Sequence, residues 1–175
     1  MPIKSYIRTI PDHPRKGILF RDVTGLLEDA RGLRTAVDMI VQRYTGEGVD
    51  LVAGIEARGF IFGSPVAYAL GVGFIPLRKA GKLPGEVVGV DYELEYGTDR
   101  LEMHVGAIGE GRSVLLIDDL IATGGTAEAA VKLIRGVGGV VKECCFVIDL
   151  PELGGTARLD ALGCASFALC EFEGA

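Results

Sequence analysis

The order of apolar and polar residues along the chain predicts alternating strands and helices. Short apolar runs rich in β-branched residues are typical of strands that are buried on both faces. Between these runs, apolar residues recur at the three- and four-residue spacing of amphipathic helices. The predicted strands are 49–55, 72–77, 91–95, 101–105, 114–117, 140–150 and 165–172. The predicted helices are 33–44, a helix from about 58 to 70, a helix after residue 126 and a short helix or turn at 158–163. This alternation predicts an α/β fold with a mainly parallel sheet flanked by helices.

Two segments depart from the alternation. The first 30 residues contain Pro11, Pro14 and an extended apolar trio, 18–20. This trio is either a strap over the edge of the core or a wall for a flat aromatic base, with Phe20 stacking on it. Residues 91–105 predict a hairpin that turns at 97–99 and carries few apolar residues. We expect it to stand away from the core as a lid.

The string VLLIDDLIATGGT, residues 114–126, predicts a phosphate site. Along this segment an apolar strand is followed by the acidic pair Asp118 and Asp119, then by a loop of small residues and the start of a helix. Such a loop lets backbone N–H groups converge on a phosphate, and the helix start adds unpaired donors. The acidic pair suits sugar hydroxyls or a divalent cation carried on the phosphates. The alternative is a strand-end acidic pair, a glycine turn and a threonine helix cap. No Gly-Lys-Ser/Thr follows, which excludes a Walker A loop.

Charged residues also follow other predicted strands, where α/β proteins place their ligands. Arg58 either pairs with Glu56 in a structural corner or faces an anionic ligand. The loop 78–85 holds the densest basic cluster of the chain and is either a solvated loop or a clamp for phosphates. Asp149, at the end of a later strand, should lie near the same crevice.

Composition narrows the class of protein. The chain has 175 residues, 49% of them hydrophobic, and a mean hydropathy of +0.34, which predicts one domain with a sizeable core. The net charge of −6 argues against a broad nucleic-acid or anionic-membrane surface. The four cysteines lack Cys-x-x-Cys spacing, so a zinc site is not expected. No apolar leader or membrane-spanning stretch is seen, and we expect a soluble cytoplasmic protein.

The segment 114–126, VLLIDDLIATGGT, resembles the diphosphate-sugar signature of type I phosphoribosyltransferases. GILFRDVTGLLED, EARGFIFG, RKAGKLPG and YELEYG, in this order and spacing, resemble the adenine phosphoribosyltransferase family over about residues 5–173. The resemblance implies the type I phosphoribosyltransferase fold in a single domain, 1–175. It also implies a small N-terminal hood at about 1–30 and a lid loop and hairpin at about 79–105.

The resemblance further implies purine salvage: adenine and phosphoribosyl diphosphate (PRPP) give AMP and diphosphate, with Mg2+ carried by PRPP rather than by direct protein ligands. It implies a homodimer and no nucleic-acid or membrane partner. The implied catalytic residues are Glu95 and Arg58. The implied PRPP and AMP contacts are Asp118, Asp119, Ala122, Thr123, Gly124, Gly125, Thr126, Lys79, Lys82 and Tyr96. The implied adenine contacts are Leu19, Phe20, Arg21 and Leu150, with Leu19 and Arg21 acting largely through backbone groups.

Two alternatives stay open at this point. The same reaction could use another purine base, hypoxanthine or xanthine, because backbone contacts to a base leave no side-chain trace. The chain could also be a non-catalytic sensor of PRPP or nucleotides, although it lacks an added nucleic-acid-binding module. A methyltransferase is disfavoured because the early Gly-x-Gly turn is absent.

Overall fold

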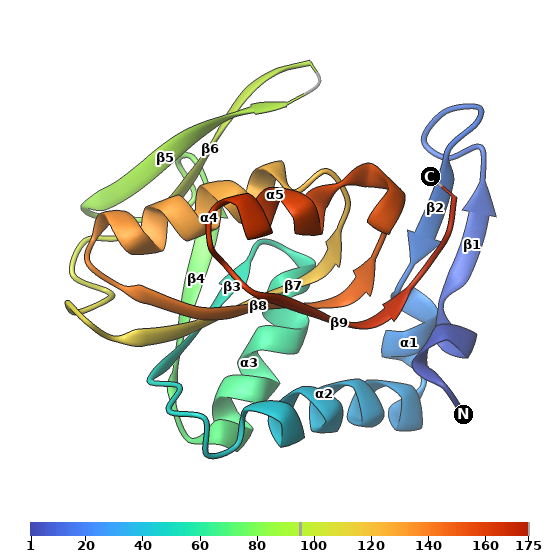
Figure 1. The fold of residues 1–175 in the computed structure, drawn as a ribbon, viewed down its shortest axis with the longest axis horizontal. Helices are drawn as coiled ribbons and strands as arrows, with labels where there is room; N and C mark the ends of the chain where they lie inside the picture. Colours follow the sequence, from blue (N-terminus) through green and yellow to red (C-terminus); the bar gives the residue numbers. More distant parts are fainter. Residues whose placement is uncertain (95, 175) are drawn as a thin grey trace.

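The computed structural model describes residues 1–94 and 96–174, which form a seven-stranded sheet, a separate two-stranded sheet and helices on both faces of the larger sheet (Figure 1). The predictions for Glu95 therefore lie outside the described residues. The α/β fold with a mainly parallel sheet is confirmed. In the part of the chain that is described, no helix is long and apolar enough to cross a membrane.

The larger sheet has the order β5-β6-β4-β3-β7-β8-β9. Strand β3 runs parallel to β4 and β7, and β7, β8 and β9 continue in parallel, whereas β6 is antiparallel to both β4 and β5. The smaller sheet pairs β1 and β2 in antiparallel fashion. The strands are β1 Arg8–Pro11, β2 Leu19–Asp22, β3 Leu51–Ile55, β4 Gly73–Lys79, β5 Val87–Leu94, β6 Gly97–His104, β7 Ser113–Ile121, β8 Val140–Asp149 and β9 Ser166–Glu171.

Helix ends follow local sequence signals. The Asp29 side chain caps α2 by accepting hydrogen bonds from the N–H groups of Arg31 and Gly32, and Gly71 ends α3 in the left-handed conformation. The helices are η1 Ile3–Tyr6, α1 Thr24–Glu28, α2 Ala30–Tyr44, α3 Arg58–Leu70, α4 Gly125–Gly136, η2 Pro151–Leu153 and α5 Gly155–Ala161.

Apolar layers cover both faces of the sheet. Strand β7 alternates between them: Leu116 packs with residues of α4 and α5, and Leu115 packs with residues of α2 and α3. Figure 1 shows α4 and α5 on one side of the sheet and α2 and α3 on the other. This double coverage explains why the parallel strands read as continuous apolar runs.

Helix α3 begins unusually close to β7. A Cβ atom at Gly59 would lie 2.8 Å from the carbonyl oxygen of Ile117, so only glycine permits this approach. The contact brings the first residue of α3, Arg58, beside the acidic pair Asp118 and Asp119 of β7.

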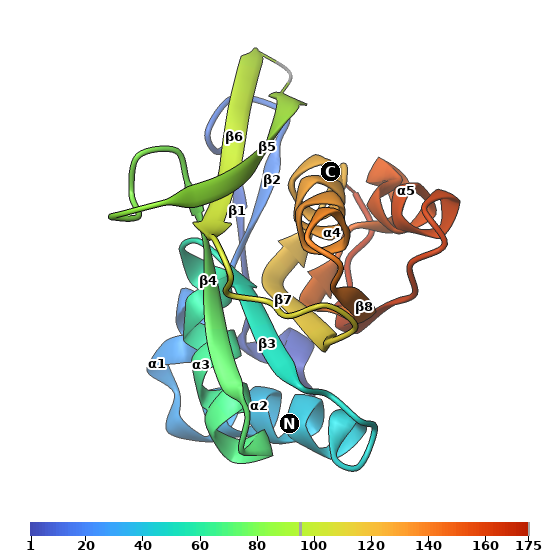
Figure 2. The ribbon, with the colours of Figure 1, turned by 90° about the vertical axis from the view of Figure 1, so that its left-hand side faces the viewer.

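The predicted hairpin exists, but two of its details were wrong. Its strands are longer than predicted, so residues 97–99 belong to β6 rather than to the turn. The hairpin was also expected to stand away from the core, yet Leu101 and Met103 are each only 1% exposed. Because β6 pairs with the end of β4, this half of the hairpin belongs to the core. Figure 2 shows the other end of β5 and β6 extending beyond the helices.

Other boundaries also differ from the prediction, including the start of α2, which is Ala30 rather than Leu33. Strand β7 was expected to end at Ile117, but it continues to Ile121, so Asp118 and Asp119 lie within the strand. They therefore point to opposite faces of the sheet. Helix α5 begins at Gly155 rather than at Arg158.

Candidate active site

The carboxyl ends of β3, β4 and β7 surround a cavity of about 160 Å³. It is lined by Ile55, Glu56, Ala57, Arg58, Lys79, Tyr92, Leu101, Asp118, Asp119 and Thr126. Five of these residues were named from the sequence, namely Arg58, Lys79, Asp118, Asp119 and Thr126. The sheet order brings them together from three separate strand ends, as expected for a ligand site in an α/β protein.

An ion pair joins two of these residues. The Arg58 guanidinium donates a hydrogen bond to the carboxylate of Asp119, which is only 5% exposed. Burial lowers the pKa of Arg58, but the hydrogen bond and charge of Asp119 outweigh burial, and the pKa is raised overall. Among the described contacts, Arg58 does not pair with Glu56. The Glu56 carboxylate instead accepts a 2.5 Å hydrogen bond from Arg78.

Asp118 is in a different state from Asp119. Its carboxylate accepts a 2.8 Å hydrogen bond from the backbone N–H of Asp119. Burial raises the pKa of Asp118 well above the ordinary value, and the nearby charge of Asp119 raises it further. The acidic pair thus combines one ion-paired carboxylate with one whose proton is held more tightly.

The loop 122–126 forms a second cavity of about 190 Å³ beside the first, and Asp118 and Thr126 line both. Gly124 has φ of +83°, and a Cβ atom there would lie 2.9 Å from Gly155. Helix α4 begins at Gly125, so the unpaired N–H groups of its first turn are available to an anion. A wall of backbone at a helix start suits a phosphate group.

The basic loop reaches the 160 Å³ cavity through one of its two lysines, Lys79. The ammonium group of Lys79 is bonded to Asp99 of β6, which raises the pKa of Lys79, and the Tyr92 hydroxyl lies 3.4 Å from the same carboxylate. Lys82 is exposed and lies outside the lining of the cavity, and its N–H donates to the carbonyl of Lys79. The Glu102 carboxylate accepts a 3.1 Å hydrogen bond from the N–H of Gly81, which ties the loop to β6.

The residues implied to bind adenine lie on two other segments. Leu19, Phe20 and Arg21 form β2, and Leu150 follows β8. Among the described residues, these four are not part of the lining of the 160 Å³ cavity. Phe20 contacts the ring of His13 edge-on, with centroids 5.0 Å apart.

The Arg21 side chain is 9% exposed and holds the C-terminal segment. It donates hydrogen bonds to the hydroxyl of Thr9 and to the carbonyl oxygens of Glu173 and Gly174. Its Nε, like the Oδ1 atom of Asp149, is buried without a hydrogen-bond partner among the described residues. The side chain of Arg21 therefore has a structural role.

Tyr96 is 77% exposed at the end of the lid. Its hydroxyl accepts a 2.9 Å hydrogen bond from Arg15, whose guanidinium also lies 5.6 Å from the ring centroid. This contact joins the tip of the hairpin to the loop between β1 and β2.

Sequence reasoning missed the polar partners of the basic loop and of Glu56. Asp99, the partner of Lys79, was predicted to lie in the turn of the hairpin, and Glu102, which holds the N–H of Gly81, in a strand that stands away from the core. The pairing of Glu56 with Arg78 was not among the alternatives. One signal in the sequence could have indicated the role of Glu102. Glu102 lies between the apolar residues Leu101 and Met103, and it is buried, at 7% exposure. Within residues 1–94 and 96–174, no three His, Cys, Asp or Glu side chains are grouped so that they could hold a metal ion.

Comparisons with known proteins show the family of this chain. The phosphoribosyl transferase domain family matches residues 25–165. Adenine phosphoribosyltransferase of Nitrosomonas europaea is 62% identical over 173 residues, which cover 99% of each chain. The enzyme of the same name from Methylobacillus flagellatus is 64% identical over 173 residues, covering 99% of this chain and 98% of the relative.

Solved structures agree as well. The crystal structure of adenine phosphoribosyltransferase from Thermoanaerobacter pseudethanolicus superposes with a TM-score of 0.92 at 49% identity, covering 97% of this chain and 98% of the other. The Saccharomyces cerevisiae enzyme, crystallised with adenine and an imino-altritol bisphosphate, gives 0.91 at 38% identity, covering 96% of both chains. The chain therefore belongs to the adenine phosphoribosyltransferase family.

Proposed function

We propose that this chain transfers the 5-phosphoribosyl group of PRPP to adenine, giving AMP and diphosphate. The observation that carries the proposal is the cavity in which Arg58, Lys79, Asp118 and Asp119 meet beside the 122–126 loop. Cations, carboxylates and a backbone cradle in one place match the three chemical parts of PRPP. Those parts are a diphosphate, ribose hydroxyls and a 5′-phosphate.

Each part has its own contacts in this proposal. Asp118 and Asp119 accept hydrogen bonds from the ribose hydroxyls, and the backbone of 122–126 wraps the 5′-phosphate. Arg58, Lys79 and Lys82 face the diphosphate, where positive charge stabilises the leaving group as its bond to C1′ breaks. Lys82 is exposed on its loop, so it reaches the ligand by loop movement or from a partner subunit.

We propose Mg2+ as the ion that PRPP carries into the site. Asp118 and Asp119, which both line the cavity, are neighbours of this ion rather than its direct ligands. When bound, the ion neutralises charge on the departing diphosphate. The residues of the chain hold the ribose and phosphates around it.

The base lies between β2 and the end of β8 in this proposal. Phe20 stacks on the ring, Leu150 packs against it, and backbone groups of Leu19 and Arg21 read its edge. Glu95 supplies the carboxylate that handles the proton of a purine ring nitrogen, with Tyr96 beside it on the lid. Residues 1–30 then act as the hood and 79–105 as the lid of a single domain, 1–175.

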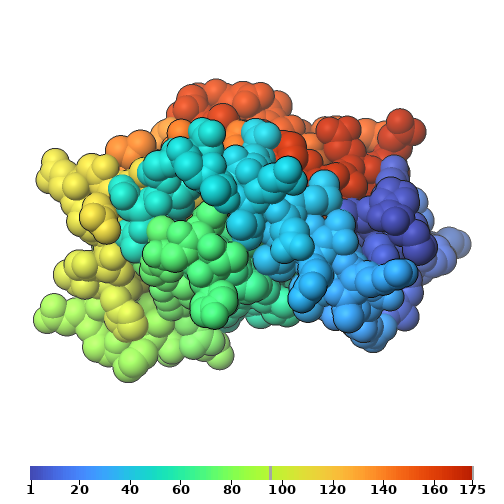
Figure 3. Space-filling view, turned by 90° about the horizontal axis from the view of Figure 1, so that it is seen from below, coloured from blue at the N-terminus to red at the C-terminus, as the bar shows by residue number. Residues whose placement is uncertain are grey.

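We further propose a homodimer formed through α3. Ile61 and Tyr68 are 43% and 89% exposed and lie two turns apart on this helix, on the same face. Helices α2 and α3 occupy the underside of the molecule (Figure 3). Arg58 begins α3, so an interface there lies close to the proposed diphosphate site. Tyr68→Glu should convert a dimer to a monomer in light scattering, whereas a wild-type monomer would contradict the proposal.

The cytoplasm is the proposed location. Cys144, Cys145, Cys164 and Cys170 are all free thiols, which is the usual state in a reducing compartment.

The test of the proposed function is diphosphate release from PRPP and Mg2+ with adenine, hypoxanthine, guanine, xanthine and uracil in parallel. Release with adenine alone is the expected result. Release with another base would keep the PRPP site and overturn the assignment of the base. PRPP binding without release for any base would overturn catalysis and favour the sensor.

A further inference from the structure

Phe172 lies directly after β9 and is 9% exposed. Its ring is contacted by two cations from separate elements. The Lys4 ammonium of η1 and the Arg21 guanidinium of β2 each lie 4.6 Å from the ring centroid. Both distances fall within the range of a cation–π interaction. The ring therefore joins η1 and β2 to the end of β9.

The backbone around Phe172 extends the same connection. The N–H of Phe172 donates a 3.0 Å hydrogen bond to the carbonyl of Asp149, the residue before Leu150. The carbonyl oxygens of Glu173 and Gly174 accept hydrogen bonds of 2.7 Å and 3.2 Å from Arg21. The segment 172–174 is thus bonded on one side to β2 and on the other to the end of β8.

These two attachments coincide with the two walls of the proposed base pocket. One wall is β2, with Leu19 to Arg21, and the other is Leu150. The two-stranded sheet that contains β2 shares no hydrogen-bonded strand pair with the larger sheet among the described residues. Its position relative to Leu150 must therefore be set by other contacts, and the segment 172–174 supplies contacts to both walls.

We propose that Phe172 is a positioning residue for the base: its ring and backbone set the spacing between β2 and Leu150. This inference rests on the proposed function, because it names the residue that shapes the pocket without touching the substrate. It predicts a specific effect on base affinity, since the contacts of Phe172 do not reach the 160 Å³ cavity that faces PRPP.

The test compares Phe172→Leu with Phe172→Tyr. Leucine keeps apolar bulk but removes the aromatic face that both cations contact, and we expect KM for adenine to rise about tenfold. We expect kcat and KM for PRPP to stay within about twofold of wild type. Tyrosine keeps the ring and should restore the wild-type KM for adenine.

Phe167→Leu is a matched control. Phe167 lies near the start of the same strand, and its ring is 3.8 Å from the guanidinium carbon of Arg43, so the same kind of contact is lost away from the proposed pocket. This variant should lower the melting temperature while leaving KM for adenine unchanged. An unchanged KM for adenine in Phe172→Leu, or an equal rise in KM for both substrates, would overturn the inference.

The wild-type assay separates this inference from the proposed function. If the wild type uses a different purine, the same comparison is made with that base. If it releases no diphosphate with any base, the proposed function fails, and the inference fails with it. An active wild type with no KM difference between Phe172→Leu and Phe167→Leu would overturn the inference alone.

Discussion

The Arg58 guanidinium, at the first residue of α3, is bonded to the Asp119 carboxylate in β7. Removing the charge of Asp119 should weaken PRPP binding, because the carboxylate both orients Arg58 and is the proposed ribose acceptor. We expect Asp119→Asn to raise the Kd for PRPP with Mg2+ about tenfold or more by calorimetry. The control is Asp91→Asn, which removes an exposed partner of Arg100 on β5. Equal affinity in the two variants would contradict the ribose assignment.

Glu95→Gln should lower kcat by about 10²- to 10⁴-fold, the usual range for loss of a general acid or base. The shape of the side chain is kept, so KM for PRPP should change little. Glu93→Gln, in β5 and two residues earlier in the sequence, should retain wild-type turnover. A wild-type kcat in Glu95→Gln would remove this carboxylate from the mechanism.

The pKa of Asp118 predicts a stability difference that depends on pH. Burial and the charge of Asp119 place the pKa of this carboxyl in the folded chain above its value in the unfolded chain. Between these two values the folded state keeps a proton that the unfolded state releases, so stability falls as pH rises through this window. Asp118→Asn has no such proton and should melt at higher temperature than wild type at about pH 8. Below about pH 3.9, the ordinary aspartate pKa, the two should converge. A melting-temperature difference that is the same at both pH values would contradict the raised pKa.

Glu102 holds the basic loop through the N–H of Gly81. Glu102→Ala removes this acceptor, so the loop that carries Lys79 and Lys82 loses one of its attachments to β6, while the bond from Lys79 to Asp99 remains. We expect KM for PRPP to rise about tenfold, near the lower end of the range for the loss of one hydrogen bond to a charged group. Glu110→Ala, on an exposed turn, provides the comparison. If both variants leave KM for PRPP unchanged, the loop does not depend on Glu102.

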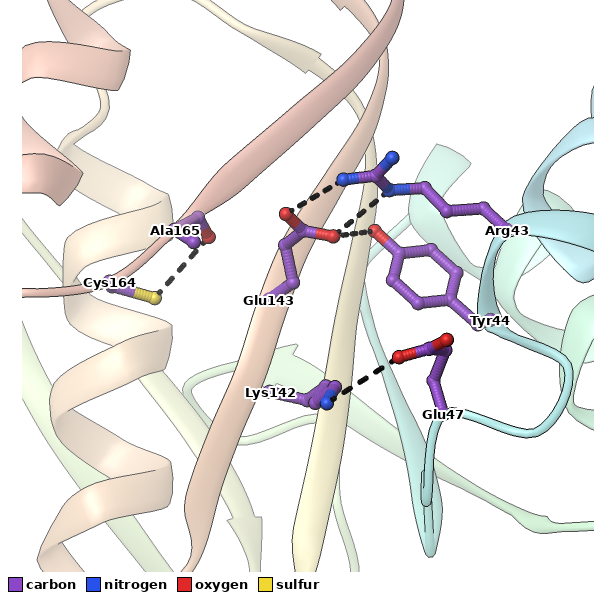
Figure 4. A network of polar contacts seen from close by, with 7 residues as sticks. All are labelled: Arg43, Tyr44, Glu47, Lys142, Glu143, Cys164 and Ala165. Atoms are coloured by element: carbon purple, nitrogen blue, oxygen red, sulfur yellow. Dashed lines mark hydrogen bonds and ion pairs between the residues drawn. The ribbon is translucent and has the colours of Figure 1, made fainter.

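Glu143, near the start of β8, is the centre of a polar network (Figure 4). Its carboxylate accepts hydrogen bonds of 3.0 Å and 3.1 Å from Arg43 and of 2.6 Å from the Tyr44 hydroxyl. Glu143→Ala should lower the free energy of unfolding by about 2 kcal/mol, because partly buried donors lose a charged acceptor. Kinetic constants should stay at wild-type values.

The control for this network is an ion pair a short distance away. Lys142 and Glu47 are 3.9 Å apart and largely exposed, so Glu47→Ala should cost less than about 1 kcal/mol. Equal losses in chemical denaturation would show that the Glu143 network contributes no more than a surface pair.

The parallel strands were predictable because burial on both faces leaves an unbroken apolar run, as at 114–117. The hairpin was harder to place. Leu101 and Met103 alternate with polar residues in a way that fits a solvated strand as well as a half-buried one. Their burial depends on the pairing of β6 with β4, and nothing in the local pattern encodes that neighbour.

The candidate site also has a part that the sequence predicts and a part that it does not. The acidic pair and the 122–126 loop are contiguous in sequence, so one string revealed them together. The pairings of Arg58 with Asp119 and of Lys79 with Asp99 join residues on different elements. Those pairings follow from the sheet order β6-β4-β3-β7 and from the close approach at Gly59, which local periodicity does not specify.

The cations of the cavity already have internal counter-ions: Arg58 is bonded to Asp119, and Lys79 to Asp99. An anionic ligand that binds these cations must therefore replace a carboxylate partner, because neither cation is without a counter-ion. A small monovalent anion gains little from such an exchange, since it must displace a carboxylate and offers nothing to it in return. A ligand that carries several negative charges together with hydroxyl groups gains on both sides, because its hydroxyls can satisfy the displaced carboxylate. We therefore expect the two ion pairs to favour a polyvalent ligand with hydroxyl groups over a simple monovalent anion.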